Sequence, residues 1–317
     1  MLKAIVVSRG RAGMLRRFGL MLLTGCMFVF VGSPVASASM VKPLDLDNTW
    51  SCSVSSGYTY DEVQSQYNVC APGGYGLSYH LRDPANNLVA CTVPAGFTYS
   101  LAASTYNVCA ANGYSNSYTL KTPANGIVVC TLPSGYTYTS AASTYNVCAV
   151  NSYGNSYTIA TPADNLVACT LPAGFTYSLA ASTYNVCAVN ANANAYTLKT
   201  PVNNLVACTL PSGFTYSLTA STYNVCAVNA YGNSYTLKTP ANGIVVCTVP
   251  TGYTYTLAAA TYNVCAVNAN HNSYTIATPV SGLWACSIPA GFTYSAEQSQ
   301  YNVCAVNSTA NTYLLAG

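Results

Sequence analysis

Cysteine spacing constrains this chain more than any other feature. Fourteen cysteines are separated by gaps that alternate between 18 and 21 residues without exception, so a unit of 39 residues recurs in seven copies. No close pair of the C-x-x-C kind, which a zinc site would need, is present. The pattern therefore predicts a disulfide framework formed in an oxidising compartment. The cysteines are Cys52, Cys70, Cys91, Cys109, Cys130, Cys148, Cys169, Cys187, Cys208, Cys226, Cys247, Cys265, Cys286 and Cys304.

The two gap lengths also predict how these cysteines pair. Bridges across the 18-residue gaps join nearest neighbours and use all fourteen, beginning with Cys52–Cys70 and ending with Cys286–Cys304. Bridges across the 21-residue gaps would leave Cys52 and Cys304 single. We therefore expect one bridge within each copy, and the loop-entropy model assigns about 3 kcal/mol to each.

The start of the chain has the features of an export signal. Residues 1–38 hold four arginines, an apolar run and the small-residue site Ala36–Ser37–Ala38, which predicts a secretory signal peptide, with a linker over 39–49 and the repeat domain over 50–317. The alternative is a lipoprotein, anchored at the cell envelope through Cys26 of the sequence LTGC. The signal peptide predicts a secreted or extracellular protein, and the lipoprotein alternative predicts one that is lipid-anchored at the cell envelope. No later apolar run approaches the roughly 18 residues of a membrane span.

The net charge of the whole chain is misleading. Formally it is +3, but removal of residues 1–38 leaves five Lys and Arg against seven Asp and Glu, which is near −2. Without a basic surface there is nothing to follow a phosphate backbone, so nucleic acid is excluded as a partner.

Tyrosine and turn residues repeat with the cysteines and predict an all-β fold. Three tyrosine slots account for 21 of the 28 tyrosines. In TYNVCAV, residues 183–189, period-2 alternation predicts a strand with Asn185 and Cys187 on one face. LPAG and TPANG supply turn chemistry. Each copy divides into two strand-turn-strand halves with one cysteine each, which makes fourteen half-repeats.

Two architectures fit such a repeat: a disulfide-stapled β-solenoid and a seven-bladed β-propeller. Cysteines on the first and third strands of a propeller blade would lie about 10 Å apart, beyond bonding range, whereas stacked solenoid coils bring them within about 4.8 Å. The outer copies are also more polar, with DEVQSQ at 61–66 and AEQSQ at 296–300. Polar ends are typical of open stacks, so we favour the solenoid. The asparagine of YNVC is then expected to form a ladder between coils.

Residues able to do chemistry are scarce. His80 and His271 occupy unrelated slots of the repeat, so we expect no histidine with an orienting partner, and the few carboxylates do not recur. Asp45 and Asp47 in DLDN suggest calcium only faintly, because the other ligands of a 12-residue loop are absent. No nucleophile-elbow, metalloprotease or phosphate-loop motif occurs. We therefore predict no enzyme activity, no catalytic or metal-binding residues and no cofactor.

The repetition itself points to function. We expect a secreted or cell-surface structural and adhesive protein that presents a repeated tyrosine-rich surface to a cell-surface or matrix polymer. The alternatives are a multivalent carbohydrate-binding protein and, more weakly, an ice-binding protein. Self-association is left open, and the sequence does not tell which tyrosine column faces solvent.

Overall fold

The computed structural model describes residues 45–317, and the predicted leader, Cys26 and residues 39–44 lie outside this range. The described chain contains 21 strands and is all β. Within it, no helix has the length and apolarity to cross a membrane. The strands form seven separate antiparallel sheets of three strands each, one sheet for every copy of the repeat.

Each sheet contains a short strand, a nine-residue strand and an eight-residue strand, and the eight-residue strand lies in the middle. The short strands are β1 (Thr49–Ser51), β4 (Val89–Ala90), β7 (Val128–Val129), β10 (Val167–Ala168), β13 (Val206–Ala207), β16 (Val245–Val246) and β19 (Trp284–Ala285). The nine-residue strands are β2 (Thr59–Tyr67), β5 (Thr98–Tyr106), β8 (Thr137–Tyr145), β11 (Thr176–Tyr184), β14 (Thr215–Tyr223), β17 (Thr254–Tyr262) and β20 (Thr293–Tyr301). The central strands are β3 (Tyr75–Arg82), β6 (Tyr114–Lys121), β9 (Tyr153–Ala160), β12 (Asn192–Lys199), β15 (Tyr231–Lys238), β18 (Asn270–Ala277) and β21 (Thr309–Ala316).

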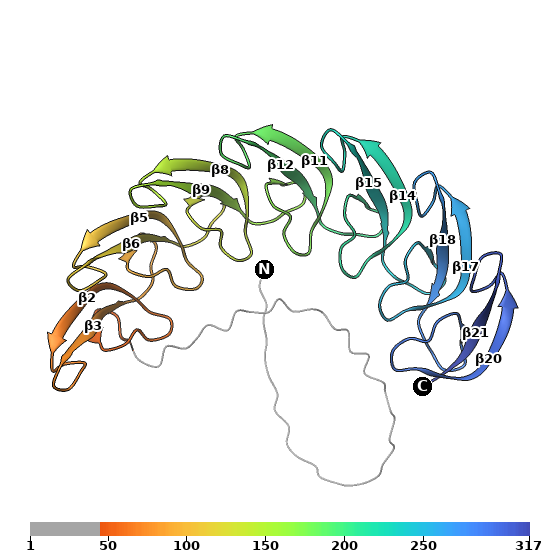
Figure 1. Ribbon diagram of the computed structural model, residues 1–317, viewed down its shortest axis with the longest axis horizontal. Coiled ribbons are helices and arrows are strands. Elements are labelled where there is room, and N and C mark those ends of the chain that lie inside the picture. The colour runs from red at the N-terminus through yellow and green to blue at the C-terminus, as the bar shows by residue number, and fades with distance from the viewer. Residues whose placement is uncertain (1–44) are drawn as a thin grey trace, which may run out of the picture. The chain divides into compact units, whose positions relative to one another are not determined.

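The sheets follow one another in an open row, with the first and last at opposite ends of the repeat domain (Figure 1). Every long strand lies at the edge of its own sheet, and each of the first six contacts the short strand of the next copy. The prediction of an all-β, disulfide-stapled solenoid of seven copies is confirmed, and the alternative of a closed propeller is not what the chain forms. The two halves of a copy are complementary parts of one sheet.

The structural copies begin slightly earlier than the sequence indicates. Asp47 Oδ1 accepts a hydrogen bond from the backbone N–H of Asp83, 36 residues later. Asn86 and Thr122 form the equivalent bond in the next copy. Residues 45–49, expected in the linker, are therefore the opening turn of copy 1. Copies 1 to 7 start at Asp45, Pro84, Pro123, Pro162, Pro201, Pro240 and Pro279.

The core of each copy is small. A single large aliphatic side chain of the central strand is almost completely buried in every copy: Leu81, Leu120, Ile159, Leu198, Leu237, Ile276 and Leu315. Around it lie the buried Ala or Val that ends each of the short strands β4, β7, β10, β13, β16 and β19, and the threonine that begins each of β2, β5, β8, β11, β14 and β17. Such a layer is too thin to stabilise one copy alone, so each copy depends on its neighbours and on its disulfide.

Two details of the predicted repeat are wrong. The strand through TYNVCAV ends at Tyr184, because Asn185 has a φ of 59° and starts a turn. The second error concerns the side chain of Asn185, which does not form the expected ladder of hydrogen bonds between copies. Asn185 Oδ1 accepts a hydrogen bond from the backbone N–H of Asn190, at 3.0 Å, and so closes the turn that carries Cys187. The equivalent bond occurs in all seven copies. Asparagine fits this slot because it tolerates the left-handed conformation.

The open row predicts that a whole copy can be removed. Deletion of residues 162–200 takes away one sheet and both Cys169 and Cys187, and it joins Thr161 to Pro201 in a Thr-Pro junction that other copies already contain. We expect a folded protein without free thiols, measured by circular dichroism, thermal melting and thiol titration. The matched control is deletion of residues 169–186, which removes one cysteine and one long strand and should leave a misfolded chain with a free thiol. Loss of folding in the 39-residue deletion would contradict the open row.

Candidate functional site

The seven disulfides follow the pairing expected from the 18-residue gaps. They are Cys52–Cys70, Cys91–Cys109, Cys130–Cys148, Cys169–Cys187, Cys208–Cys226, Cys247–Cys265 and Cys286–Cys304, with Cα atoms 5.1–5.3 Å apart. Each joins the end of a short strand to the turn that follows the long strand of the same copy. The reason for the pairing is therefore not the stacking of coils that we assumed, but the return of this turn to the short strand.

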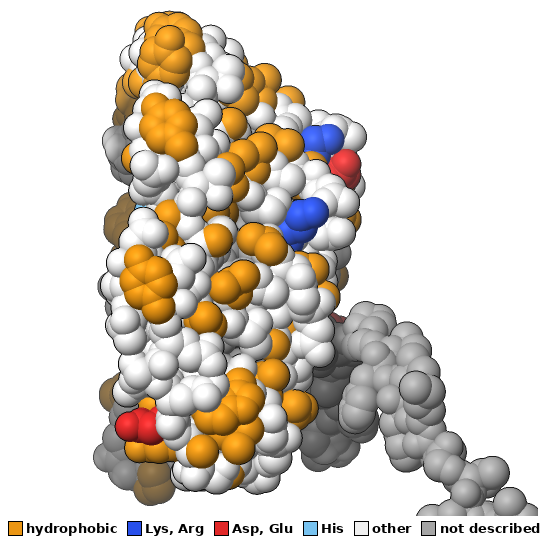
Figure 2. All heavy atoms as spheres, turned by 90° about the vertical axis from the view of Figure 1, so that its right-hand side faces the viewer, with side chains coloured by type: hydrophobic (Ala, Val, Ile, Leu, Met, Phe, Trp, Pro, Cys, Tyr) orange, Lys and Arg blue, Asp and Glu red, His pale blue; other side chains and the backbone are white. Residues whose placement is uncertain are grey.

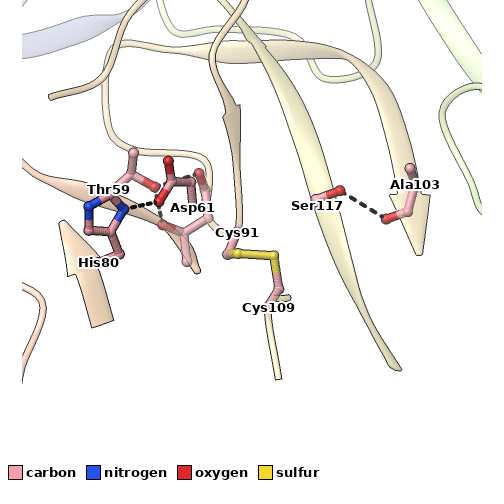
Figure 3. Close-up of a disulfide and its surroundings, with 8 residues drawn as sticks. Thr59, Asp61, His80, Cys91, Ala103, Cys109 and Ser117 are labelled. Carbon is pink, nitrogen blue, oxygen red and sulfur yellow. Dashed lines mark hydrogen bonds and ion pairs between the residues drawn. A yellow bond between two sulfur atoms is a disulfide. The ribbon is translucent and has the colours of Figure 1, made fainter. Parts of the chain in front are cut away.

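Each disulfide fixes the surface that meets the preceding copy. The backbone N–H of Cys169 donates to the carbonyl of Tyr138, and the carbonyl of Val186 accepts from the N–H of Ala141. Thr137 and Thr170 add a hydroxyl contact of 2.7 Å. All six interfaces between copies repeat this set of contacts. We call the short-strand end and the cysteine turn of each copy its receiving face. Figure 3 shows Cys91–Cys109 of the second copy close to Thr59 of the first.

Two of the three tyrosine slots support this interface. The first-slot tyrosine is the second residue of each long strand, and the third-slot tyrosine lies on the central strand of the same copy, as Tyr138 and Tyr157 do. The ring centroids of the seven pairs are 4.9–5.2 Å apart; six pairs lie edge to face, and Tyr177–Tyr196 is tilted. In four copies the first-slot hydroxyl donates to the carbonyl of the second cysteine of the next copy, as Tyr177 does to Cys226 at 3.2 Å. These tyrosines are structural.

The remaining slot, the tyrosine of YNVC, faces solvent. It ends each long strand, and between 53% and 67% of its surface is exposed in the seven copies: Tyr67, Tyr106, Tyr145, Tyr184, Tyr223, Tyr262 and Tyr301. In copies 1, 2, 3 and 5 it faces a second tyrosine that starts the central strand and is 73–76% exposed: Tyr75, Tyr114, Tyr153 and Tyr231. The ring centroids of these four pairs are 5.3–5.4 Å apart. We call all eleven residues the tip tyrosines.

Grooves between copies run beside the tip tyrosines. One, of about 600 Å³, is lined by Leu101–Ser104 and Tyr114 of copy 2 and by Asn146, Val150 and Asn151 of copy 3. The oxygen of the Asn146 side chain accepts from Asn151 N–H, which leaves its amide nitrogen as a donor. A similar groove of about 470 Å³ follows copy 4, where Asn192 replaces the second tyrosine. The groove thus combines an aromatic wall with an amide donor.

A second type of groove lies at the proline turns. One, of about 740 Å³, is lined by Leu171–Phe175 of copy 4 and by Leu210, Pro211 and Phe214 of copy 5, among others. Figure 2 shows ring-shaped hydrophobic side chains at intervals along one margin of the repeat domain and few charged groups on that face. Contacts of this surface with a partner would therefore depend on aromatic area and neutral hydrogen bonds.

Copy 1 contains a cluster that sequence analysis missed. His80 Nδ1 lies 2.7 Å from Asp61 Oδ1 (Figure 3). Arg82 donates to the other carboxylate oxygen at 2.6 Å. Arg82 also lies 3.4 Å from Asp47, and Trp50 packs against the His80 ring. The hydrogen bond to Asp61 raises the pKa of Arg82, partly offset by burial. Our expectation that no histidine has an orienting partner is therefore wrong.

The chemistry of this cluster is that of an ion pair. Asp61 stands at a β-bulge, where serine or threonine occupies the slot in the other copies, and the bulge turns its side chain toward the central strand. No group of three or more possible metal ligands occurs in residues 45–317. His271 lies elsewhere, exposed on β18, 3.2 Å from the carbonyl of Asn272. The two histidines do not come together.

A scan against protein-family models finds no matching family, and comparisons with curated proteins and with solved structures find no match either.

The first-slot tyrosines predict a loss of stability in alkali. Burial raises the pKa of Tyr60, Tyr99, Tyr138, Tyr177, Tyr216 and Tyr255 above 10.0, and a neighbouring tyrosine adds to the shift. The unfolded chain thus loses these protons first, so the free energy of unfolding falls as pH rises above about 10. Denaturant melts across this range, with phenolate absorbance, measure the effect. Tyr138→Phe should weaken the pH dependence while costing about 1 kcal/mol at neutral pH through loss of the bond to Cys187. An unchanged pH dependence in this variant would contradict the assignment.

Proposed function

We propose that this chain is an extracellular structural and adhesive repeat protein without catalytic activity, which contacts a cell-surface or matrix polymer through the tip tyrosines. The observation that carries the proposal is the difference between the tyrosine slots. Tyrosines of two slots pack within and between copies, whereas the YNVC tyrosine is exposed in every copy, at the same place in each sheet. A folded protein has no structural need to expose so many aromatic side chains in register.

Repetition converts weak contacts into strong attachment. Each copy offers one or two exposed phenol rings, which supply contact area and a hydroxyl group at low entropic cost. Seven copies on one framework, held by two backbone hydrogen bonds at each interface, present these rings at a fixed spacing. A polymer with its own repeat can engage several copies at once, so the affinity of one copy need not be high.

The disulfides and the predicted leader support an extracellular location for this protein. Seven disulfides persist only where the environment is oxidising. The predicted signal peptide and the alternative lipid anchor at Cys26 both direct the chain to such a place.

A glycan is the second candidate, and the grooves beside the tip tyrosines favour it. Tyr114 supplies a flat aromatic wall, and Asn146 and Asn151 of the next copy supply neutral polar groups within the same groove. Sugar rings have apolar faces and hydroxyl edges, and such a groove matches both. A neutral polysaccharide would meet several such grooves along the row.

Two copies already carry asparagine in place of the second tip tyrosine, and this residue can be used to test the contact surface. Copies 4 and 6 carry Asn192 and Asn270 opposite the YNVC tyrosine. Changing Tyr75, Tyr114, Tyr153 and Tyr231 to Asn therefore removes four exposed rings without disturbing the fold. We expect at least tenfold weaker retention on extracted cell-surface or matrix material and on insoluble polysaccharides, measured by pull-down and quartz-crystal microbalance.

A matched control removes exposed apolar groups elsewhere. Val89, Val128, Val167 and Val245 lie on the short strands and are 53–54% exposed. Changing these four to Thr should leave retention unchanged. Equal retention of the tyrosine variant and the unaltered protein would overturn the proposal, and competition by soluble oligosaccharides would separate the glycan from other polymers.

A further inference from the structure

The six interfaces within the row define what a seventh would require. A long strand offers a backbone carbonyl, a backbone N–H three residues later and a threonine hydroxyl, as Tyr177, Ala180 and Thr176 do. The receiving face of the next copy supplies the hydrogen-bond partners of these groups. They are the N–H of its first cysteine, the carbonyl of the valine before its second cysteine, and a side-chain hydroxyl. At each of the six interfaces, these hydrogen-bonding groups are paired with one another.

Among residues 45–317, both halves of this interface lack a partner copy at the ends of the row. In residues 45–317 no copy follows β20, and Tyr294 on this strand is 48% exposed. At the other end, no described residue precedes the receiving face of copy 1. Cys52 is exposed there, whereas its equivalents in the other copies are buried, and Val69 is 57% exposed. Ser53 stands where the other copies have the hydroxyl partner, and Ser287 already serves that purpose within the row. A second copy of this chain could therefore extend the row.

One residue in the final strand does not fit this interface. The N–H donor of the long strand is a small or apolar residue in the first six copies, and it is 3–8% exposed: Val63, Ala102, Ala141, Ala180, Thr219 and Ala258. In copy 7 the same slot holds Glu297. The rest of the strand is compatible with an interface, because copies 1 and 7 share the following residues QSQY, and copy 1 does pack against copy 2.

We propose that Glu297 prevents this protein from joining a second copy of itself head to tail. In a joined pair, the carboxylate would be enclosed between the strand and the apolar cysteine turn of the next chain. Burial of an unpaired charge costs more free energy than two backbone hydrogen bonds return. An inward-facing charge is a known means of blocking an edge strand. Without it, the contact is heterologous, so it would produce head-to-tail oligomers, either linear chains or closed rings.

The test uses the protein produced with its disulfides formed. Glu297→Val restores the residue of copy 1, and we expect concentration-dependent multiples of the chain mass in sedimentation velocity, where the unaltered protein stays a monomer. Glu297→Thr, which restores the residue of copy 5, should behave likewise. Glu62→Ala removes one negative charge from a half-exposed slot of copy 1 outside the interface contacts, and it should remain monomeric.

A second substitution identifies the surface involved. Val69→Glu places a charge on the exposed receiving face of copy 1, so the double variant Val69→Glu with Glu297→Val should return to a monomer. Three results would overturn the proposal: monomeric behaviour of both folded Glu297 variants, equal oligomerisation of the unaltered protein, or oligomers of Glu297→Val that persist when Val69→Glu is added. Stability of the Glu297 variants, followed by thermal melting, should not fall, because this slot is exposed.

Discussion

The contact between a long strand and the receiving face of the next copy is the interaction on which this structure depends. Every long strand lies at the edge of its sheet, and an edge strand leaves backbone groups unpaired. Here the next copy satisfies two of them with the cysteine N–H and the valine carbonyl. Those two groups belong to segments far apart along the copy, so they must be held together before they can receive a strand. The disulfide does this at every interface.

This arrangement explains the unusual composition. A copy of 39 residues buries one Leu or Ile side chain almost completely, and charged residues are 5% of the chain, so neither a large core nor ion pairs stabilise it. Disulfides reduce the entropy of the unfolded chain, and tyrosines fill the space between sheets while their hydroxyls reach backbone carbonyls. The exception is copy 1, where Asp61, His80 and Arg82 form an ion-pair cluster.

The features that depend on residue spacing could be predicted from the sequence, whereas those that depend on strand ends and strand register could not. The period and the disulfide partners follow from cysteine positions alone, and the all-β class follows from the strand alternation and the turn residues. The end of the strand at Tyr184 was missed because NVCAV continues the alternation, although the asparagine or glycine five residues after Asn185 and its equivalents could have indicated a closed turn. Asp61 and His80 are brought together by a bulge that no pattern reveals. A signal was present, however: Asp61, His80 and Arg82 all depart from the repeat in the same copy.

The seven copies act as a comparison within one chain, and that comparison separates scaffold from surface. Several slots of the framework do not vary: the cysteines, the turn asparagine and the first-slot tyrosine are the same in all seven copies. The slot opposite the YNVC tyrosine holds tyrosine, asparagine or threonine, and where it holds tyrosine the side chain is 73–76% exposed. The framework therefore fixes the positions of the tip tyrosines, while the residue type opposite the YNVC tyrosine can change. A surface that varies on a constant frame is suited to contact with a partner, whereas the frame itself needs only to repeat.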